Sequence, residues 1–209
     1  MNVSDCRLIV FAKAPVPGRV KTRLIPRIGP SAAAALYEQL ILHTLSMASD
    51  AQIGPVDLWC APSAEHPFFH RCAKKLPISL FNQADGDLGA RMAHAFRETL
   101  TETSLALLIG TDCPSLTPDC LKEGAEVLQR GTAAVIAPSE DGGYVLIGLR
   151  RYAPELFEDI SWGTGSVLRQ TRERLRGLGW TWHELPGQWD VDRPEDMERL
   201  NREGNFAKP

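Results

Sequence analysis

The fold of this chain is decided by residues 8–24, which read L-I-V-F-A-K-A-P-V-P-G-R-V-K-T-R-L. The apolar run Leu8–Phe11 is typical of a buried strand, and the two prolines and the glycine after it indicate a loop. Backbone N–H groups and cations on such a loop, at a strand end, suit a polyphosphate, although a solvated basic turn has the same composition. The cations of the loop are Lys13, Arg19, Lys21 and Arg23.

Composition excludes several classes of protein. The chain has 209 residues, 44% of them hydrophobic and 23% charged, which predicts one domain over residues 1–209. A net charge of −3 argues against nucleic-acid binding, and no apolar run has the roughly 18 residues of a membrane span. The polar start, Met1–Arg7, is unlike a signal peptide, and the five scattered cysteines form no C-x-x-C pair. We therefore expect a cytoplasmic protein. Small enzymes are often homodimers, so a homodimer is the expected oligomeric state.

Strand and helix patterns alternate along the chain, which predicts a three-layer αβα sandwich around a mostly parallel, Rossmann-like sheet. Ser31 is the expected N-cap of the first long helix, and Pro67 is expected to interrupt the second. Thr117 and Pro118 are the expected cap and first residue of a later helix. The expected strands are 8–11, 56–61, 78–81, 105–110, 133–137, 144–149 and 181–185. The expected helices are 31–49, 63–75, one ending near 103, one from 118, 165–178 and 194–202.

Acidic residues follow the strands of this sheet, where ligands bind in open α/β folds. Asp112 comes directly after the apolar strand 105–110, and a carboxylate there suits Mg²⁺ or Mn²⁺ together with substrate phosphates. Near the C-terminus, residues 189–196 read W-D-V-D-R-P-E-D, a second acidic cluster. Each has a structural alternative, because Asp112 can cap the turn at Pro114 and Asp192 can cap the helix that begins at Pro194.

Four segments together resemble the nucleotide-diphospho-sugar transferase superfamily, whose fold is called GT-A. They are F-A-K-A-P-V-P-G-R-V-K-T-R-L, I-G-T-D-C-P-S-L, E-D-G-G-Y-V-L-I-G-L and D-V-D-R-P-E-D-M. More closely, the chain resembles a bacterial branch of glycosyltransferase-like proteins, DUF2064, some of them linked to arsenosugar biosynthesis. The resemblance implies that Asp112 and Asp192 hold the metal, with Asp190 as the substitute. It also implies nucleotide binding by Ala12, Lys13, Gly18, Arg19, Lys21 and Arg23.

Further candidates come from shorter patterns. Gly89 and Arg91 lie in G-D-L-G-A-R-M at a helix start, where backbone N–H groups and a guanidinium can meet a nucleotide. Asp141 is a candidate base for an acceptor hydroxyl, or the first residue of an ordinary Asp-Gly turn. The Gly142–Gly143 pair allows close approach of a substrate, and Trp162 can stack on a sugar or on the core.

Three functions follow. The first is a metal-dependent glycosyltransferase that uses a nucleotide-diphospho-sugar donor and an unknown acceptor, with Lys21, Asp112 and Asp141 as catalytic residues. The metal and Lys21 would stabilise charge that grows on the leaving diphosphate. The second is a nucleotidylyltransferase resembling guanylyltransferases, which releases pyrophosphate. The third is a nucleotide-binding protein without catalytic turnover.

Overall fold

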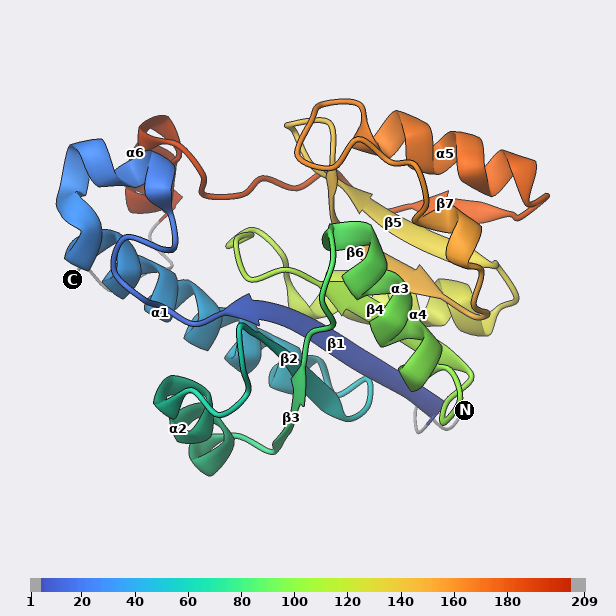
Figure 1. The fold of residues 1–209 in the computed structure, drawn as a ribbon. Helices are drawn as coiled ribbons and strands as arrows, with labels where there is room; N and C mark the ends of the chain where they lie inside the picture. The colour runs from blue at the N-terminus through green and yellow to red at the C-terminus, as the bar shows by residue number, and fades with distance from the viewer. Residues whose placement is uncertain (1–4, 204–209) are drawn as a thin grey trace.

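A computed structural model of the protein describes residues 5–203 (Figure 1). Seven strands form one sheet in the order β3-β2-β1-β4-β6-β5-β7. β6 runs antiparallel to both of its neighbours, and the other pairs are parallel. The strands are β1 (Cys6–Lys13), β2 (Val56–Ala61), β3 (Ile78–Asn82), β4 (Leu105–Ile109), β5 (Ala134–Pro138), β6 (Tyr144–Leu149) and β7 (Trp182–Glu184).

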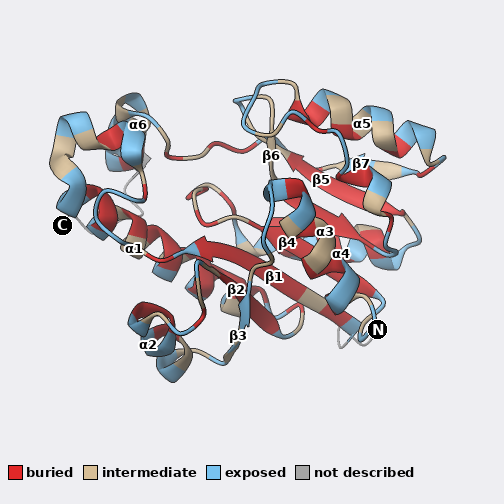
Figure 2. Ribbon diagram, viewed as in Figure 1, coloured by how far each residue is buried: buried red, intermediate tan, exposed pale blue. Residues whose placement is uncertain are grey.

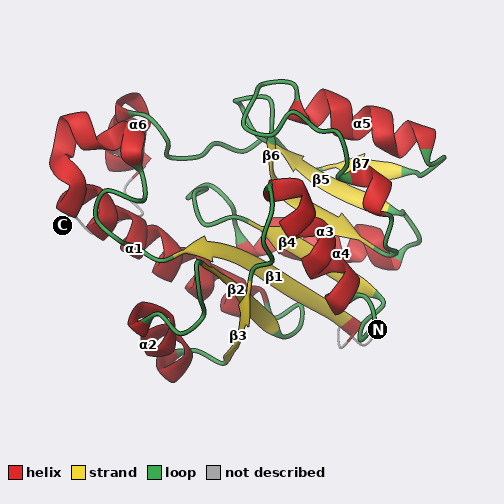
Figure 3. Ribbon diagram, viewed as in Figure 1, coloured by secondary structure: helices red, strands yellow, loops and turns green. Residues whose placement is uncertain are grey.

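Helices cover both faces of the sheet, and loops join them to the strands (Figure 3). One buried cluster packs α1, α2, α4 and α6 on one face, and a second packs α3 and α5 on the other. The α/β three-layer prediction is therefore confirmed. The helices are α1 (Ile25–Ala51), α2 (Pro67–Lys75), α3 (Leu88–Thr99), α4 (Pro118–Gln129), α5 (Val167–Gly177) and α6 (Pro194–Glu203), with short 3₁₀ helices η2 (Thr22–Leu24) and η3 (Pro154–Leu156).

The two central strands are apolar because both of their faces are covered (Figure 2). In β1, Leu8 and Val10 pack toward the α1 side, while Ile9 packs toward the α3 side. All five residues of β4 are buried. The run of apolar residues without polar alternation is the sequence signal of such a strand.

Two helix starts differ from the predictions. Ser31 is not an N-cap, because α1 begins at Ile25 and kinks at Gly29, whose φ of 79° and ψ of 162° are not helical. Pro30 restarts the helix with its fixed φ, so Ser31 falls inside the first turn. Pro67 does not interrupt α2 but is its first residue, and the His66 side chain caps it by accepting from the Phe68 N–H.

Of the two cap predictions for the later helices, one agrees with the structure and one does not. Thr117 accepts from the Cys120 N–H and Pro118 is the first residue of α4, which confirms that prediction. Asp192 is not the cap of α6, because the Asp196 carboxylate accepts instead from the N–H groups of Asp192 and Arg193. In the described part of the chain, no helix has both the length and the hydropathy needed to cross a membrane.

The strand order places the site. Successive strands β1, β2 and β3 extend to one side, and β4, β6 and β5 extend to the other, so the direction of winding changes between β1 and β4. Ligands of open α/β sheets bind beyond the carboxyl ends of the strands at such a switch point. Lys13 ends β1 and Asp112 follows β4, so the two predicted motifs meet there.

Candidate functional site

A cleft of about 670 Å³ opens at this switch point. Its walls come from two parts of the chain. Residues 11–92 contribute all of its lysines and arginines, and residues 108–192 contribute carboxylates and no cation. We call these the basic wall and the acidic wall. The predicted residues that line the cleft are Ala12, Lys13, Arg19, Lys21, Arg23, Arg91, Asp112, Asp141, Gly143, Trp162, Asp190 and Asp192.

The strand ends are held in place by Tyr37 of α1. Its hydroxyl accepts the Lys13 N–H at 3.1 Å and lies 3.0 Å from Thr111 Oγ1, which lies 3.5 Å from the Phe11 carbonyl. Burial, and then the negative charge of Asp112, raise the pKa of the Tyr37 phenol, so it stays neutral. This chain of contacts fixes the start of the basic loop against the turn that carries Asp112.

Lys21 joins the basic loop to both acidic segments. Its backbone is left-handed (φ 48°), and its side chain is only 5% exposed. Nζ donates to the Val191 carbonyl at 2.5 Å and forms an ion pair with Asp112 Oδ1 at 2.5 Å. The ammonium also lies 5.6 Å from the centre of the Tyr37 ring. Lys21 is therefore fixed before any ligand arrives.

The turn after β4 and the segment after β7 run side by side, although about 75 residues separate them in the sequence. The Val191 N–H donates to the Asp112 carbonyl at 2.8 Å, and Ser115 Oγ donates to Gln188 Oε1 at 2.9 Å. In Figure 1 the segment between β7 and α6 crosses from the β7 side toward the start of α1. This crossing brings Asp190 and Asp192 to the cleft.

Asp190 lies within electrostatic range of two other carboxylates. Burial raises the pKa of its carboxyl, and the negative charges of Asp141 and Asp112 raise it further, against the opposing effect of Lys21. Ser139 Oγ lies 3.3 Å from Asp190 Oδ1 and donates to it. Three acids are thus concentrated at one end of the cleft.

The donor set fits a divalent cation held by two carboxylates. Asp112 is half exposed to the cleft, and its buried Oδ1 has the Lys21 ammonium as a neighbour at 2.5 Å. Carboxylate oxygens are the ligands preferred by Mg²⁺ and Mn²⁺. Within residues 5–203, no three His, Cys, Asp or Glu side chains converge on one point, so substrate oxygens would complete the shell.

Asp192 faces a different partner. Its carboxylate pairs with the Arg23 guanidinium, and both side chains are largely exposed. Asp190, the substitute metal ligand, is the residue of this pair that interacts with Asp112. The geometry therefore favours Asp190 over Asp192 beside Asp112.

The remaining cations of the basic wall differ in whether their side chains already have an interaction partner. Among the interactions of the described residues, the side chains of Lys13 and Arg19 have no partner, and both residues are exposed. Arg91 Nε donates to the Gly86 carbonyl at 3.0 Å. Asp87, the acid of this wall, caps α3 by accepting from the Ala90 N–H at 2.8 Å. Lys13 and Arg19 are thus the cations that can turn to a ligand without breaking a contact.

Three predicted glycines shape the cleft without lining it. A Cβ at Gly89 would lie 2.6 Å from Trp162 Nε1, and a Cβ at Gly142 would lie 2.4 Å from the Gly165 carbonyl oxygen. Gly18 has a φ of 80° in the turn of the basic loop. Gly89 and Gly142 thus allow close packing behind the wall.

Asp141 and Trp162 belong to the acidic wall of the cleft. Asp141 Oδ1 accepts the Gly143 N–H at 2.9 Å, so the Asp-Gly turn exists, and the residue lines the cleft as well. Trp162 meets Tyr144 edge to face at 6.4 Å. The indole is partly buried, with one part against Tyr144 and one part at the cleft.

Sequence patterns missed three polar residues of the cleft. Tyr37 lies within a helix rich in Ala and Leu and has no distinguishing pattern, whereas Ser139 directly follows β5. Gln83 follows β3, and its Nε2 donates to the carbonyls of Trp59 at 2.8 Å and Ala12 at 3.3 Å. Its position directly after a strand was the signal that could have identified it.

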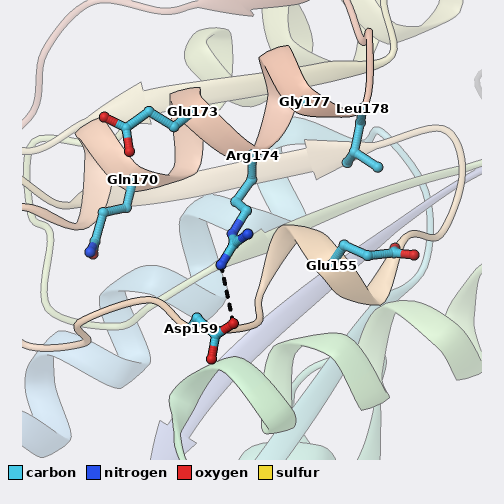
Figure 4. Close-up of a pocket in the computed structure, with 7 residues that line it drawn as sticks. All are labelled: Glu155, Asp159, Gln170, Glu173, Arg174, Gly177 and Leu178. Atoms are coloured by element: carbon cyan, nitrogen blue, oxygen red, sulfur yellow. Dashed lines mark hydrogen bonds and ion pairs between the residues drawn. The ribbon is translucent and has the colours of Figure 1, made fainter.

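A second hollow, of about 490 Å³, lies between α5 and η3 (Figure 4). Its walls carry Glu155, Glu173 and an ion pair between Arg174 and Asp159 at 3.4 Å. It contains none of the residues that sequence motifs indicated.

Comparison with protein families gives one match. Residues 44–164, more than half of the chain, match the family described as "Uncharacterized protein conserved in bacteria (DUF2064)". The chain belongs to this family. No curated protein matches it in sequence.

Solved structures extend the comparison. A protein of Desulfovibrio desulfuricans G20 called a "putative nucleotide-diphospho-sugar transferase" is 30% identical, with a TM-score of 0.88 over 98% of this chain and 90% of that one. The 4-diphosphocytidyl-2C-methyl-D-erythritol synthase of Anaerococcus prevotii DSM 20548 has 12% identity and a TM-score of 0.64, over 97% and 99% of the two chains. Glucosyl-3-phosphoglycerate synthase of Mycobacterium tuberculosis, solved with Mn²⁺ and UDP, has 10% identity and a TM-score of 0.56, over 94% and 75%. The last two share the fold, which is that of GT-A and nucleotidyltransferase proteins.

Proposed function

We propose that the protein is a metal-dependent glycosyltransferase that takes its sugar from a nucleotide-diphospho-sugar. The observation that carries this proposal is the arrangement of the cleft, in which Asp112 and the other carboxylates of the acidic wall face a wall of cations. The similarity to the Desulfovibrio desulfuricans protein supports the same donor class.

The basic wall would bind the diphosphate. Lys13 and Arg19 are exposed and free to form charge-assisted hydrogen bonds with phosphate oxygens. Arg23 would exchange its surface pair with Asp192 for a phosphate, at small cost because both partners are largely exposed. Lys21 would hold the Asp112 carboxylate in position rather than travel to the ligand.

Asp112 and Asp190 would hold Mg²⁺ or Mn²⁺ together with the diphosphate. When bound, such an ion stabilises the charge that develops on the leaving diphosphate. The negative charges of Asp141 and Asp112 both disfavour the charged form of Asp190, so a divalent cation beside Asp112 and Asp190 would be favourable. Asp141, on the acidic wall, would accept the proton of the acceptor hydroxyl.

A nucleotidylyltransferase is the second candidate, and one observation favours it. Cytidylyltransferase folds superpose on nearly the whole chain, with a TM-score of 0.64 for the Anaerococcus prevotii enzyme. The same cations and carboxylates would then support attack on an α-phosphate, with release of pyrophosphate.

A thermal-shift panel separates the candidates. UDP-, GDP-, dTDP- and CDP-sugars and the four nucleoside triphosphates would each be tested with and without Mn²⁺, because ligands that bind the folded state raise its melting temperature. We expect a metal-dependent shift from one nucleotide-sugar and from its nucleoside diphosphate. A shift from a nucleoside triphosphate alone would favour nucleotidyl transfer, and the product, nucleoside diphosphate or pyrophosphate, would decide. Binding with neither product would favour a protein without turnover.

A further inference from the structure

The acceptor side of the cleft differs in charge from the donor side. Its lining comes from the β5–β6 turn, the start of β6 and the segment before α5, and we call it the acceptor segment. It contains one carboxylate and no lysine, arginine or histidine. Its members are Ser139, Asp141, Gly143, Tyr144, Val145, Trp162, Gly163, Thr164 and Val167.

Two hydroxyls of this segment are engaged, whereas Trp162 Nε1 and the Tyr144 hydroxyl are buried without a hydrogen-bond partner among the described residues. Ser139 Oγ donates to Asp190, and Thr164 Oγ1 donates to the Ser161 carbonyl at 2.7 Å. Asp141 accepts one backbone N–H and remains exposed. What the segment offers a ligand is therefore a carboxylate beside the partly exposed Trp162 and the apolar side chain of Val145.

The cations of the basic wall have other roles, since Lys13, Arg19 and Arg23 are the ones that would bind the diphosphate. Lys21 is buried against Asp112 and Val191, and Arg91 is bonded to the Gly86 carbonyl. The partly buried Asp190 adds a second carboxylate to the same wall of the cleft. A phosphate or carboxylate placed here would meet negative charges and no positively charged donor of the segment.

We infer that the acceptor is a hydroxyl compound that carries neither phosphate nor carboxylate. Its hydroxyl would meet Asp141, and a C–H face would pack on Trp162. This inference rests on the proposed glycosyl transfer, and it separates this protein from enzymes whose second substrate is a phosphomonoester.

The experiment has two stages. In the first, the nucleotide-sugar identified by thermal shift with Mn²⁺ establishes donor binding, and failure here would overturn the proposed function itself. In the second, the same donor, labelled in a neutral sugar, is incubated with the protein and a bacterial small-molecule extract. Labelled products other than the donor and the free sugar are then passed over an anion-exchange resin. We expect them in the flow-through, and label retained on the resin as a phosphorylated or carboxylated product would overturn the inference. No product despite donor binding would count against glycosyl transfer.

A variant tests the residue responsible. Glycerol with glycerol 3-phosphate, and glucose with glucose 6-phosphate, serve as matched pairs, compared by kcat/KM. Asp141→Asn removes both the negative charge and the candidate base. The loss of the base lowers kcat/KM for both members of a pair alike, so the ratio of the two kcat/KM values reports the effect of the charge. We expect the preference for the neutral member to fall about tenfold. An unchanged ratio, or a wild-type preference for the phosphorylated member, would overturn the inference.

Discussion

The basic and acidic walls of the cleft differ in how their charges are held. On the basic wall, Lys13 and Arg19 are exposed and have no partner among the described residues. On the acidic wall, Asp112 is fixed by Lys21, while Asp190 accepts from Ser139 and interacts with two other acids. One wall therefore has cations that can follow a ligand, and the other has carboxylates placed in advance.

Chain topology explains this difference. The basic wall is built by residues 11–92, whose strands wind to one side of β1, and the acidic wall by residues 108–192, whose strands wind to the other. The walls meet in two ion pairs, Lys21 with Asp112 and Arg23 with Asp192. The first is buried on the lysine side and the second is largely exposed, so the first positions a group and the second can open.

The largest expected effect is at Asp112, where the basic and acidic walls meet. Asp112→Asn should reduce metal-dependent nucleotide binding at least about a hundredfold, since changes even one shell outside a metal site cost 10–100-fold. Titration calorimetry of the nucleoside diphosphate with Mn²⁺ measures this, with circular dichroism to verify the fold because Lys21 loses its counter-charge. Asp119→Asn is the control, as that side chain is 94% exposed on α4. Unchanged affinity in Asp112→Asn would remove this residue from the site.

The next effect concerns the contact between the walls. Gly89→Ala places a Cβ 2.5 Å from the Phe157 carbonyl oxygen and 2.6 Å from Trp162 Nε1, so the indole must move. Overpacking of this kind costs about 1–3 kcal/mol of unfolding free energy, and acceptor turnover should fall with it. Gly177→Ala is the matched control, since its Cβ would meet nothing within 4 Å. There we expect a gain of about 0.5 kcal/mol. Equal effects of the two substitutions on urea unfolding would contradict the packing explanation.

Arg19→Ala tests the basic wall alone. A charge-assisted hydrogen bond contributes about 1.5–3 kcal/mol, so nucleotide affinity should fall at least about tenfold. Stability should change by no more than about 0.5 kcal/mol, because the side chain has no partner among the described residues. Lys21→Ala should lower both affinity and stability, since its ammonium contacts Asp112 and Val191. Arg130→Ala, a surface residue of an i,i+4 pair, should change neither.

Much of this arrangement is visible in the sequence. Local signals give the strands, and β2 and β6 begin and end at the predicted residues because Pro and Gly flank apolar runs there. The acidic turn and the basic loop could be placed together because strand ends share one edge of a parallel sheet. The sequence also indicates an acidic cluster at residues 190–196, without its partners.

Partners across the fold could not be predicted. The sequence indicates Gly89 only as part of a helix start, and does not show that the absent side chain makes room for Trp162, 73 residues away. The αL backbone of Lys21 directs its side chain to Val191 and Asp112, and no local pattern specifies that direction. Ser31 was misplaced because a positive φ at Gly29 moved the start of the regular helix. In each case a tertiary contact or a single backbone angle decided the outcome.

The smallest effect contrasts two acids through pH. Burial and neighbouring acids raise the pKa of Asp190, so the charged form of Asp190 destabilises the folded state. The hydrogen bond from Arg172 lowers the pKa of Glu184, so the charged form of Glu184 stabilises the folded state. Without metal at pH 7, Asp190→Asn should therefore raise the melting temperature, and Glu184→Gln should lower it. For Asp190 the destabilisation is absent below the unfolded pKa and appears as pH rises through the folded pKa. For Glu184 the stabilisation is present above the unfolded pKa and is lost as pH falls through the folded pKa. Both differences from the wild type should thus shrink as the pH falls into the carboxyl range, and melting curves at a series of pH values measure them.

With Mn²⁺ and nucleotide present, the higher melting temperature of Asp190→Asn should become lower than that of the wild type, because the wild-type carboxylate then binds a cation. A higher melting temperature that persisted in Asp190→Asn would exclude Asp190 as a ligand.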